Sequence, residues 1–116
     1  MIQNDIIVRN VSDKIAEAVR YISGGEVFVL GHYPHKALFP GVLSLDLLIQ
    51  LSEVLLKNRA SLKIIERVQY LHTIVPGDIC FIKCEIKKQT DAGVFVVSGE
   101  VKKGDHVAVR TKMIFS

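Results

Sequence analysis

Three groups that could move protons beside a carbonyl lie close together in the sequence: His32, Asp46 and the backbone N–H of Gly41. An imidazole with an ordinary pKa of about 6.5 accepts or releases a proton at neutral pH. A carboxyl group acts as an acid there only when burial raises its pKa. A backbone N–H at a helix start can bind a developing negative charge. Together these groups suit proton transfer next to a carbonyl.

The segment that carries Gly41 and Asp46 is predicted to be a buried helix from Pro40 to Lys57. Proline is favoured in the first turn of a helix, because its missing N–H would have no intrahelical partner there. The stretch Val42–Leu56 is apolar almost all round, which is typical of a buried helix. At roughly 15–17 residues the helix is too short to be a typical membrane span. It would therefore surround Asp46 with apolar side chains and leave the Gly41 N–H unpaired.

The polar residues of this helix follow one face at i, i+4, i+7 and i+11: Asp46, Gln50, Glu53 and Lys57. Two interpretations remain open. The face is either a narrow solvated stripe with a Glu53–Lys57 ion pair, or Asp46 points into a cavity.

The rest of the chain is predicted to form strands. Alternating or β-branched runs separated by Gly-, Asp- and Pro-containing turns indicate strands. They are 6–11, 14–22, a short extended run at 26–30, 62–72, 79–88, 94–102 and 106–115. One helix and five or six mostly antiparallel strands in 116 residues predict a single α+β domain, with the sheet wrapped around the helix.

Composition indicates a chain that buries more surface than a small monomer offers. Hydrophobic residues make up 49% of the sequence, and the chain is small, so an interface is expected. The net charge of +3 is scattered, which favours a solvated surface over a nucleic-acid site. A mild basic excess suits an acidic partner.

Cys80 and Cys84 are predicted to be reduced, buried residues of a strand. Four positions apart on one face, they would lie roughly 13 Å apart, whereas a disulfide needs Cα atoms within about 7 Å. No metal-ligand spacing is present, and the N-terminus lacks the pattern of a signal peptide. A cytoplasmic protein is expected. Lone histidines are more often surface residues than catalysts, and His35, His72 and His106 are expected at the surface.

The sequence around these groups resembles the 3-hydroxyacyl-acyl-carrier-protein dehydratases of the hot-dog fold. The family pattern G-H-F-P-G-x-P-x-x-P-G-V-L-x-x-[ED]-x-x-x-Q is matched by Gly31–Pro34 and by Phe39–Leu43, with Asp46 and Gln50 at the matching positions. Val75–Asp78 resembles the family's V-x-P-G-D turn. An aspartate at the acidic position is the choice of the decanoyl-type dehydratase/isomerase branch.

Two positions of the loop depart from the family pattern. His35 stands where the family has Gly, and Ala37 stands where it has Pro. These changes bear on whether the loop runs as in the family and whether the activity is altered or lost.

The resemblance implies a hot-dog fold and loss of water from a (3R)-hydroxyacyl thioester on acyl carrier protein. His32 would remove the C2 proton, and Asp46 would protonate or orient the departing hydroxyl. The Gly41 N–H would bind the thioester oxygen, and Gln50 would steady Asp46. Neither a cofactor nor a metal is implied. The partners implied are acyl carrier protein and a second copy, in a homodimer that shares each site or in a hexamer of three dimers.

Two other functions are compatible with the sequence. A hot-dog thioesterase could use Asp46 with water, although it does not ordinarily carry this His-x-Pro loop. A non-catalytic acyl-binding or assembly module would keep the helix and tolerate the changes at His35 and Ala37.

Overall fold

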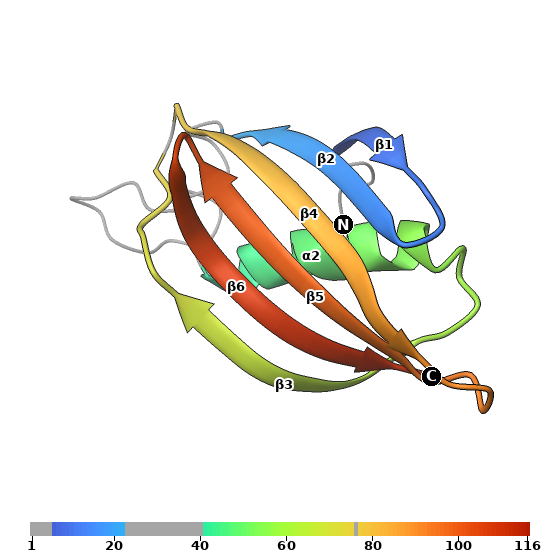
Figure 1. Ribbon diagram of the computed structural model, residues 1–116. Coiled ribbons are helices and arrows are strands. Elements are labelled where there is room, and N and C mark those ends of the chain that lie inside the picture. The colour runs from blue at the N-terminus through green and yellow to red at the C-terminus, as the bar shows by residue number, and fades with distance from the viewer. Residues whose placement is uncertain (1–5, 23–40, 76) are drawn as a thin grey trace.

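The chain folds as a curved sheet around a helix (Figure 1). The computed structural model describes residues 6–22, 41–75 and 77–116. In these residues the elements in chain order are β1 (Ile7–Val11), β2 (Ile15–Tyr21), α2 (Gly41–Leu55), β3 (Leu62–Tyr70), β4 (Ile79–Gln89), β5 (Phe95–Lys103) and β6 (His106–Phe115).

The six strands form one sheet in the order β1-β2-β4-β5-β6-β3, and every neighbouring pair is antiparallel. The strands β1 and β3 are therefore its two edges. The sheet curves around α2, which lies against one face (Figure 1). The predicted α+β architecture is confirmed.

Side-chain alternation in β4 decides which face of the sheet is buried. Cys80, Ile82, Cys84 and Ile86 are buried toward the helix, while the intervening residues are partly or fully exposed on the outer face. This period of two is the pattern of a strand with one covered face. The predicted shared face of the two cysteines is confirmed.

The helix lies close to the sheet because β5 carries a glycine beneath it. Leu47, Leu48, Leu51 and Leu55 are all buried against the sheet. A Cβ atom at Gly99 would lie 2.9 Å from Leu48 Cδ2 and 2.8 Å from Thr111 Oγ1. The missing side chain at Gly99 therefore sets the distance between the two layers.

The helix ends earlier than predicted, at Leu55 rather than Lys57. Lys57 and Asn58 adopt positive φ angles of 54° and 56°, and the Asn58 N–H donates to the carbonyl of Glu53. Left-handed residues end a helix in this way. The Glu53–Lys57 ion pair of the solvated-stripe interpretation is wrong, because Lys57 lies beyond the helix end, and no ion pair joins them.

Two further predictions concern strands: one strand is shorter than predicted, and one lies where no comparison is possible. The strand expected over 62–72 stops at Tyr70, where the Leu71 and His72 N–H groups both donate to the Ala108 carbonyl. The extended run expected over 26–30 lies outside the described residues. In the part of the chain that the structure describes, no helix is long and apolar enough to cross a membrane.

Candidate active site

The candidate site lies on the polar face of α2, where two side chains one turn apart are joined. Gln50 Nε2 donates a hydrogen bond of 2.8 Å to Asp46 Oδ2. Both side chains are only partly exposed, as is Glu53 on the next turn. The polar face is therefore neither fully solvated nor fully buried. The contact between Gln50 and Asp46 follows from their i, i+4 spacing.

In the described part of the chain, only one of the two carboxylate oxygens of Asp46 accepts a hydrogen bond. Among the described residues, the Oδ1 oxygen of Asp46 accepts no hydrogen bond, since the bond from Gln50 goes to Oδ2. An amide that holds one carboxylate oxygen fixes the orientation of the group. The other oxygen is then left for a substrate hydroxyl or a water.

Of the other predicted site residues, the structure describes Gly41 but not His32. Gly41 is the first residue of α2 that the structure describes, and the predicted helix start at Pro40 lies outside the described residues. His32 lies outside the described residues, as do His35 and Ala37. The predicted roles of His32, Asp46, Gly41 and Gln50 therefore remain predictions.

The turn before β4 joins the end of β2 to the start of β4. The Gly77 N–H donates to the Ile22 carbonyl at 2.8 Å, and the Ile22 N–H donates to the Asp78 carbonyl at 3.0 Å. The Asp78 carboxylate accepts from the Val75 N–H and forms an ion pair with Lys103 at 3.1 Å. This Asp therefore has a structural role in the turn motif.

The two thiols are poor nucleophiles. Burial raises the pKa of Cys84 to about 12, and the hydrogen bond with Ser52 lowers it only in part. Burial, with a smaller contribution from the charge of Asp78, raises the pKa of Cys80 to about 11. Both cysteines are free and buried, as predicted. Thiol chemistry at neutral pH is therefore disfavoured.

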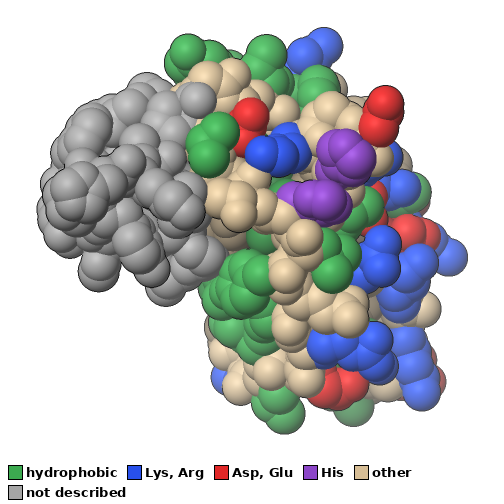
Figure 2. All heavy atoms as spheres, turned by 90° about the vertical axis from the view of Figure 1, so that its left-hand side faces the viewer, with side chains coloured by type: hydrophobic (Ala, Val, Ile, Leu, Met, Phe, Trp, Pro, Cys, Tyr) green, Lys and Arg blue, Asp and Glu red, His purple; other side chains and the backbone are tan. Residues whose placement is uncertain are grey.

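Two histidines meet where β3 ends and β6 begins. The rings of His72 and His106 lie 4.7 Å apart between centroids, and both residues are exposed (Figure 2). Their predicted surface location is confirmed. Their contact could not be read from the sequence, because it depends on the β3–β6 register. Among the described residues, no group of three or more His, Cys, Asp or Glu could hold a metal ion.

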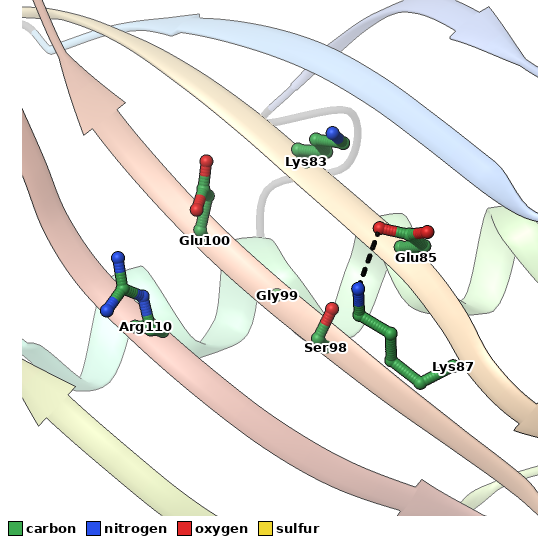
Figure 3. Close-up of a pocket in the computed structure, with 7 residues that line it drawn as sticks. All are labelled: Lys83, Glu85, Lys87, Ser98, Gly99, Glu100 and Arg110. Carbon is green, nitrogen blue, oxygen red and sulfur yellow. Dashed lines mark hydrogen bonds and ion pairs between the residues drawn. The ribbon is translucent and has the colours of Figure 1, made fainter. Parts of the chain in front are cut away.

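The outer face of the sheet has a hollow of about 270 Å³ lined by charged side chains of alternating sign (Figure 3). In the strand register, Lys83 lies opposite Glu100, which in turn lies opposite Arg110. Such cross-strand pairs stabilise a solvated sheet face. Because most of its charges have a neighbour of opposite sign, the hollow is best explained as a surface feature.

Solved structures with the same arrangement of sheet and helix show that this chain has the hot-dog fold. The dehydratase heterocomplex ApeI:P from Xenorhabdus doucetiae superposes with a TM-score of 0.75 at 23% identity, covering 90% of this chain and 88% of that one. A hypothetical thioesterase with coenzyme A from Streptococcus pneumoniae TIGR4 superposes with a TM-score of 0.82 at 11% identity, covering 97% and 84%. At these identities the likeness shows the fold.

Residues 8–110 match the model of the ApeI-like family, described as ApeI dehydratase, and the chain belongs to this family. The FabZ 3-hydroxyacyl-[acyl-carrier-protein] dehydratase of Natranaerobius thermophilus is 27% identical over 87% of this chain and 75% of its own length. The FabZ of Yersinia enterocolitica is 32% identical over 76% of this chain and 61% of its own length. The chain therefore spans less than two thirds of the latter relative.

Proposed function

We propose that this protein dehydrates (3R)-hydroxyacyl thioesters carried on acyl carrier protein to trans-2-enoyl thioesters, in fatty-acid or related acyl-chain biosynthesis. Membership of a dehydratase family supports the reaction class. The hydrogen bond from Gln50 to Asp46 is the observation that carries the proposal furthest. The bond orients a half-buried carboxyl group one to two turns into the helix, and we assign to this group the protonation of the leaving hydroxyl.

The proposed mechanism moves one proton off the substrate and one onto the leaving group. The His32 imidazole removes a proton from C2, and the resulting electron pair forms an enolate with the thioester carbonyl. The Gly41 N–H, at the positive end of the α2 dipole, stabilises the negative oxygen. The enolate then forms the C2–C3 double bond as the 3-hydroxyl leaves, protonated by Asp46, as water. Every step is a proton transfer or an elimination, so the scheme requires no metal or cofactor.

The sheet edge formed by β3 supports a dimer. An edge strand exposes unpaired backbone N–H and C=O groups that can pair with another chain. Four apolar side chains on or just after β3 are exposed: Ile64, Ile65, Tyr70 and Leu71. We propose that two copies join along this edge in a homodimer, or in a hexamer of such dimers, so that His32 of one copy meets Asp46 of the other.

The two buried thiols support a reducing compartment. Neither Cys80 nor Cys84 forms a disulfide, and such thiols persist where the cell keeps them reduced. On this ground we propose a cytoplasmic location.

One assay distinguishes dehydration from the two alternatives. The protein is incubated with 3-hydroxybutyryl and with crotonyl thioesters, while enoyl absorbance and free thiol are both followed. A dehydratase interconverts the two thioesters without releasing thiol. A hot-dog thioesterase releases thiol, and a non-catalytic acyl-binding module does neither but still binds the thioester. Either of these last two results refutes the proposal.

A further inference from the structure

An apolar patch lies on the outer face of the sheet, on the side away from α2. In the strand register, Ile7 of β1 lies opposite Val19 of β2, and Val19 lies opposite Phe81 of β4. In the same register, Tyr21 lies opposite Ile79. We call these five residues the Phe81 patch. Ile7 is 67% exposed, Tyr21 62%, and Ile79 and Phe81 50% each. A contiguous exposed patch of this kind marks an interaction surface more often than scattered apolar residues do.

Phe81 stands between two hollows, since it lines both. The first has a volume of about 460 Å³, and its charged lining residues are Arg9, Lys83, Lys102, Glu17 and Glu100. The second has a volume of about 480 Å³ and is also lined by Lys103. A half-exposed aromatic residue between two concave regions can anchor a partner whose side chains fill the hollows.

The charged side chains that line the two hollows beside Phe81 have a net positive charge. Lys103 is paired with Asp78 at 3.1 Å. Arg9 and Lys102 form no ion pair within the described part of the chain. Lys102 lies directly opposite Phe81 in the β4–β5 register. The patch therefore fits a partner that presents acidic side chains around an apolar one.

Other charged side chains near Phe81 have neighbours of opposite sign. Lys83 lies opposite Glu17 on β2 and opposite Glu100 on β5, so its charge is offset by neighbours. Asp78 is already engaged by Lys103. In the hollow beside Phe81 three cationic side chains face two acidic ones, so a net positive charge remains for a partner.

The patch also lies at the end of the molecule where the helix begins. In Figure 1 the end of β2 and the start of β4 lie at the upper left, on the same side of the view as the start of α2. Hydrogen bonds between Ile22 and the 77–78 turn tie the first two together. A protein docked on the patch would therefore stand close to the start of α2, where the proposed function places the thioester.

We propose that the Phe81 patch is the docking surface for the acidic carrier protein that delivers the thioester. This inference rests on the proposed function and adds the surface by which the partner is held. The apolar residues would supply the contact area, while Arg9 and Lys102 would attract the acidic partner and orient it.

Two variants and two matched controls test the docking surface. Phe81→Thr removes the aromatic anchor from an outward-facing strand position, and Lys102→Glu reverses an unpaired charge. Two controls lie away from the patch: Val11→Thr replaces an exposed apolar residue at the far end of β1, and Lys88→Glu reverses a charge at the far end of β4. Each variant is assayed with a 3-hydroxybutyryl group on acyl carrier protein and on N-acetylcysteamine. Its affinity for the holo-carrier protein is measured separately by fluorescence anisotropy, and its mass in solution by light scattering.

The patch variants should weaken carrier-protein binding and raise KM for the carrier-bound substrate by about tenfold or more. They should leave turnover of the N-acetylcysteamine thioester unchanged, and both controls should behave as wild type. Unchanged affinity for the carrier protein overturns the proposal, as does an equal loss with both substrates. A fall in mass for the patch variants also overturns it, because the patch would then join copies of this chain. If wild type turns over neither substrate, the proposed function fails, while the affinity measurement still decides the docking surface.

Discussion

At the scale of single residues, the proposed chemistry depends on how Asp46 is oriented. Gln50 holds one carboxylate oxygen at 2.8 Å, and among the described residues the other oxygen is free. The sequence indicated this pair through spacing alone, because residues four apart share a helix face. The contact between His72 and His106 was not predictable, since it requires the register of two strands that are far apart in the chain.

Replacing Gln50 by Leu should lower kcat while the protein stays folded. Without the amide donor the Asp46 carboxylate can rotate away from the leaving hydroxyl, and a misplaced group costs about 10- to 100-fold in rate. Initial rates with 3-hydroxybutyryl thioester measure this effect. Glu53→Gln, one turn further along the same face, is the control and should leave the rate unchanged. A normal rate for Gln50→Leu would show that Asp46 needs no such support.

The cysteines should be inert in the folded protein and should affect its stability only at high pH. Burial raises both pKa values, to about 11 for Cys80 and about 12 for Cys84. The folded state therefore keeps protons that the unfolded state loses above an ordinary thiol pKa of about 8.5. The resulting contribution to stability is complete below that pH and is lost as the pH rises toward 11–12.

Denaturant unfolding between pH 7 and pH 11 tests this sign. The free energy of unfolding should fall above about pH 9, and the fall should be smaller in Cys80→Ser and Cys84→Ser. Both variants should retain turnover within a few-fold, because neither thiol takes part in the proposed chemistry. Rapid alkylation of the native protein at pH 7 would contradict the assignment of buried, protonated thiols.

At the scale of elements, the strands were predictable because each carries a period of two with one apolar face. The Ile79–Gln89 strand and its inward cysteines are the clearest example. The end of the helix was less predictable, because neither Gly nor Pro marks it in the sequence. Lys57 and Asn58 nevertheless adopt left-handed φ angles there. Local propensity does not decide such ends when tertiary contacts do.

The close approach of α2 to the sheet should make Gly99 intolerant of a side chain. A Cβ atom there would meet Leu48 and Thr111 side-chain atoms at under 3 Å, both in the buried core. Overpacking of this kind costs about 1–3 kcal/mol, so Gly99→Ala should lower the unfolding free energy by that amount. Ser98→Ala, on the outer face of β5, is the matched control. Unchanged stability in Gly99→Ala would mean that the two layers separate at little cost.

At the scale of the whole molecule, the fold and the family are established, while the homodimer is a proposal. The family model covers residues 8–110. The sequence indicated an interface only through its hydrophobic content. The proposed interface lies at the edge strand β3, which has exposed apolar side chains such as Ile64 and Tyr70.

Sedimentation at micromolar concentration should give at least a dimer for the wild-type protein. Ile64→Lys should weaken the assembly, because it would bury a charge without a partner at the joined edges. Val11→Lys, on the opposite edge of the sheet, should sediment as wild type. A clean monomer for the wild type would refute the shared-site model.

In the proposed mechanism, His32 and Asp46 together dehydrate a 3-hydroxyacyl thioester. The most direct test is the rate of 3-hydroxybutyryl-to-crotonyl thioester conversion by wild type, His32→Ala, Asp46→Asn and a co-refolded mixture of the two variants. We predict that each variant loses about 10²–10⁴-fold in rate while keeping its fold and mass. The mixture should recover activity, because one site of each mixed dimer regains both residues. Wild-type rates in both single variants, or no conversion by the wild-type protein, would contradict the account.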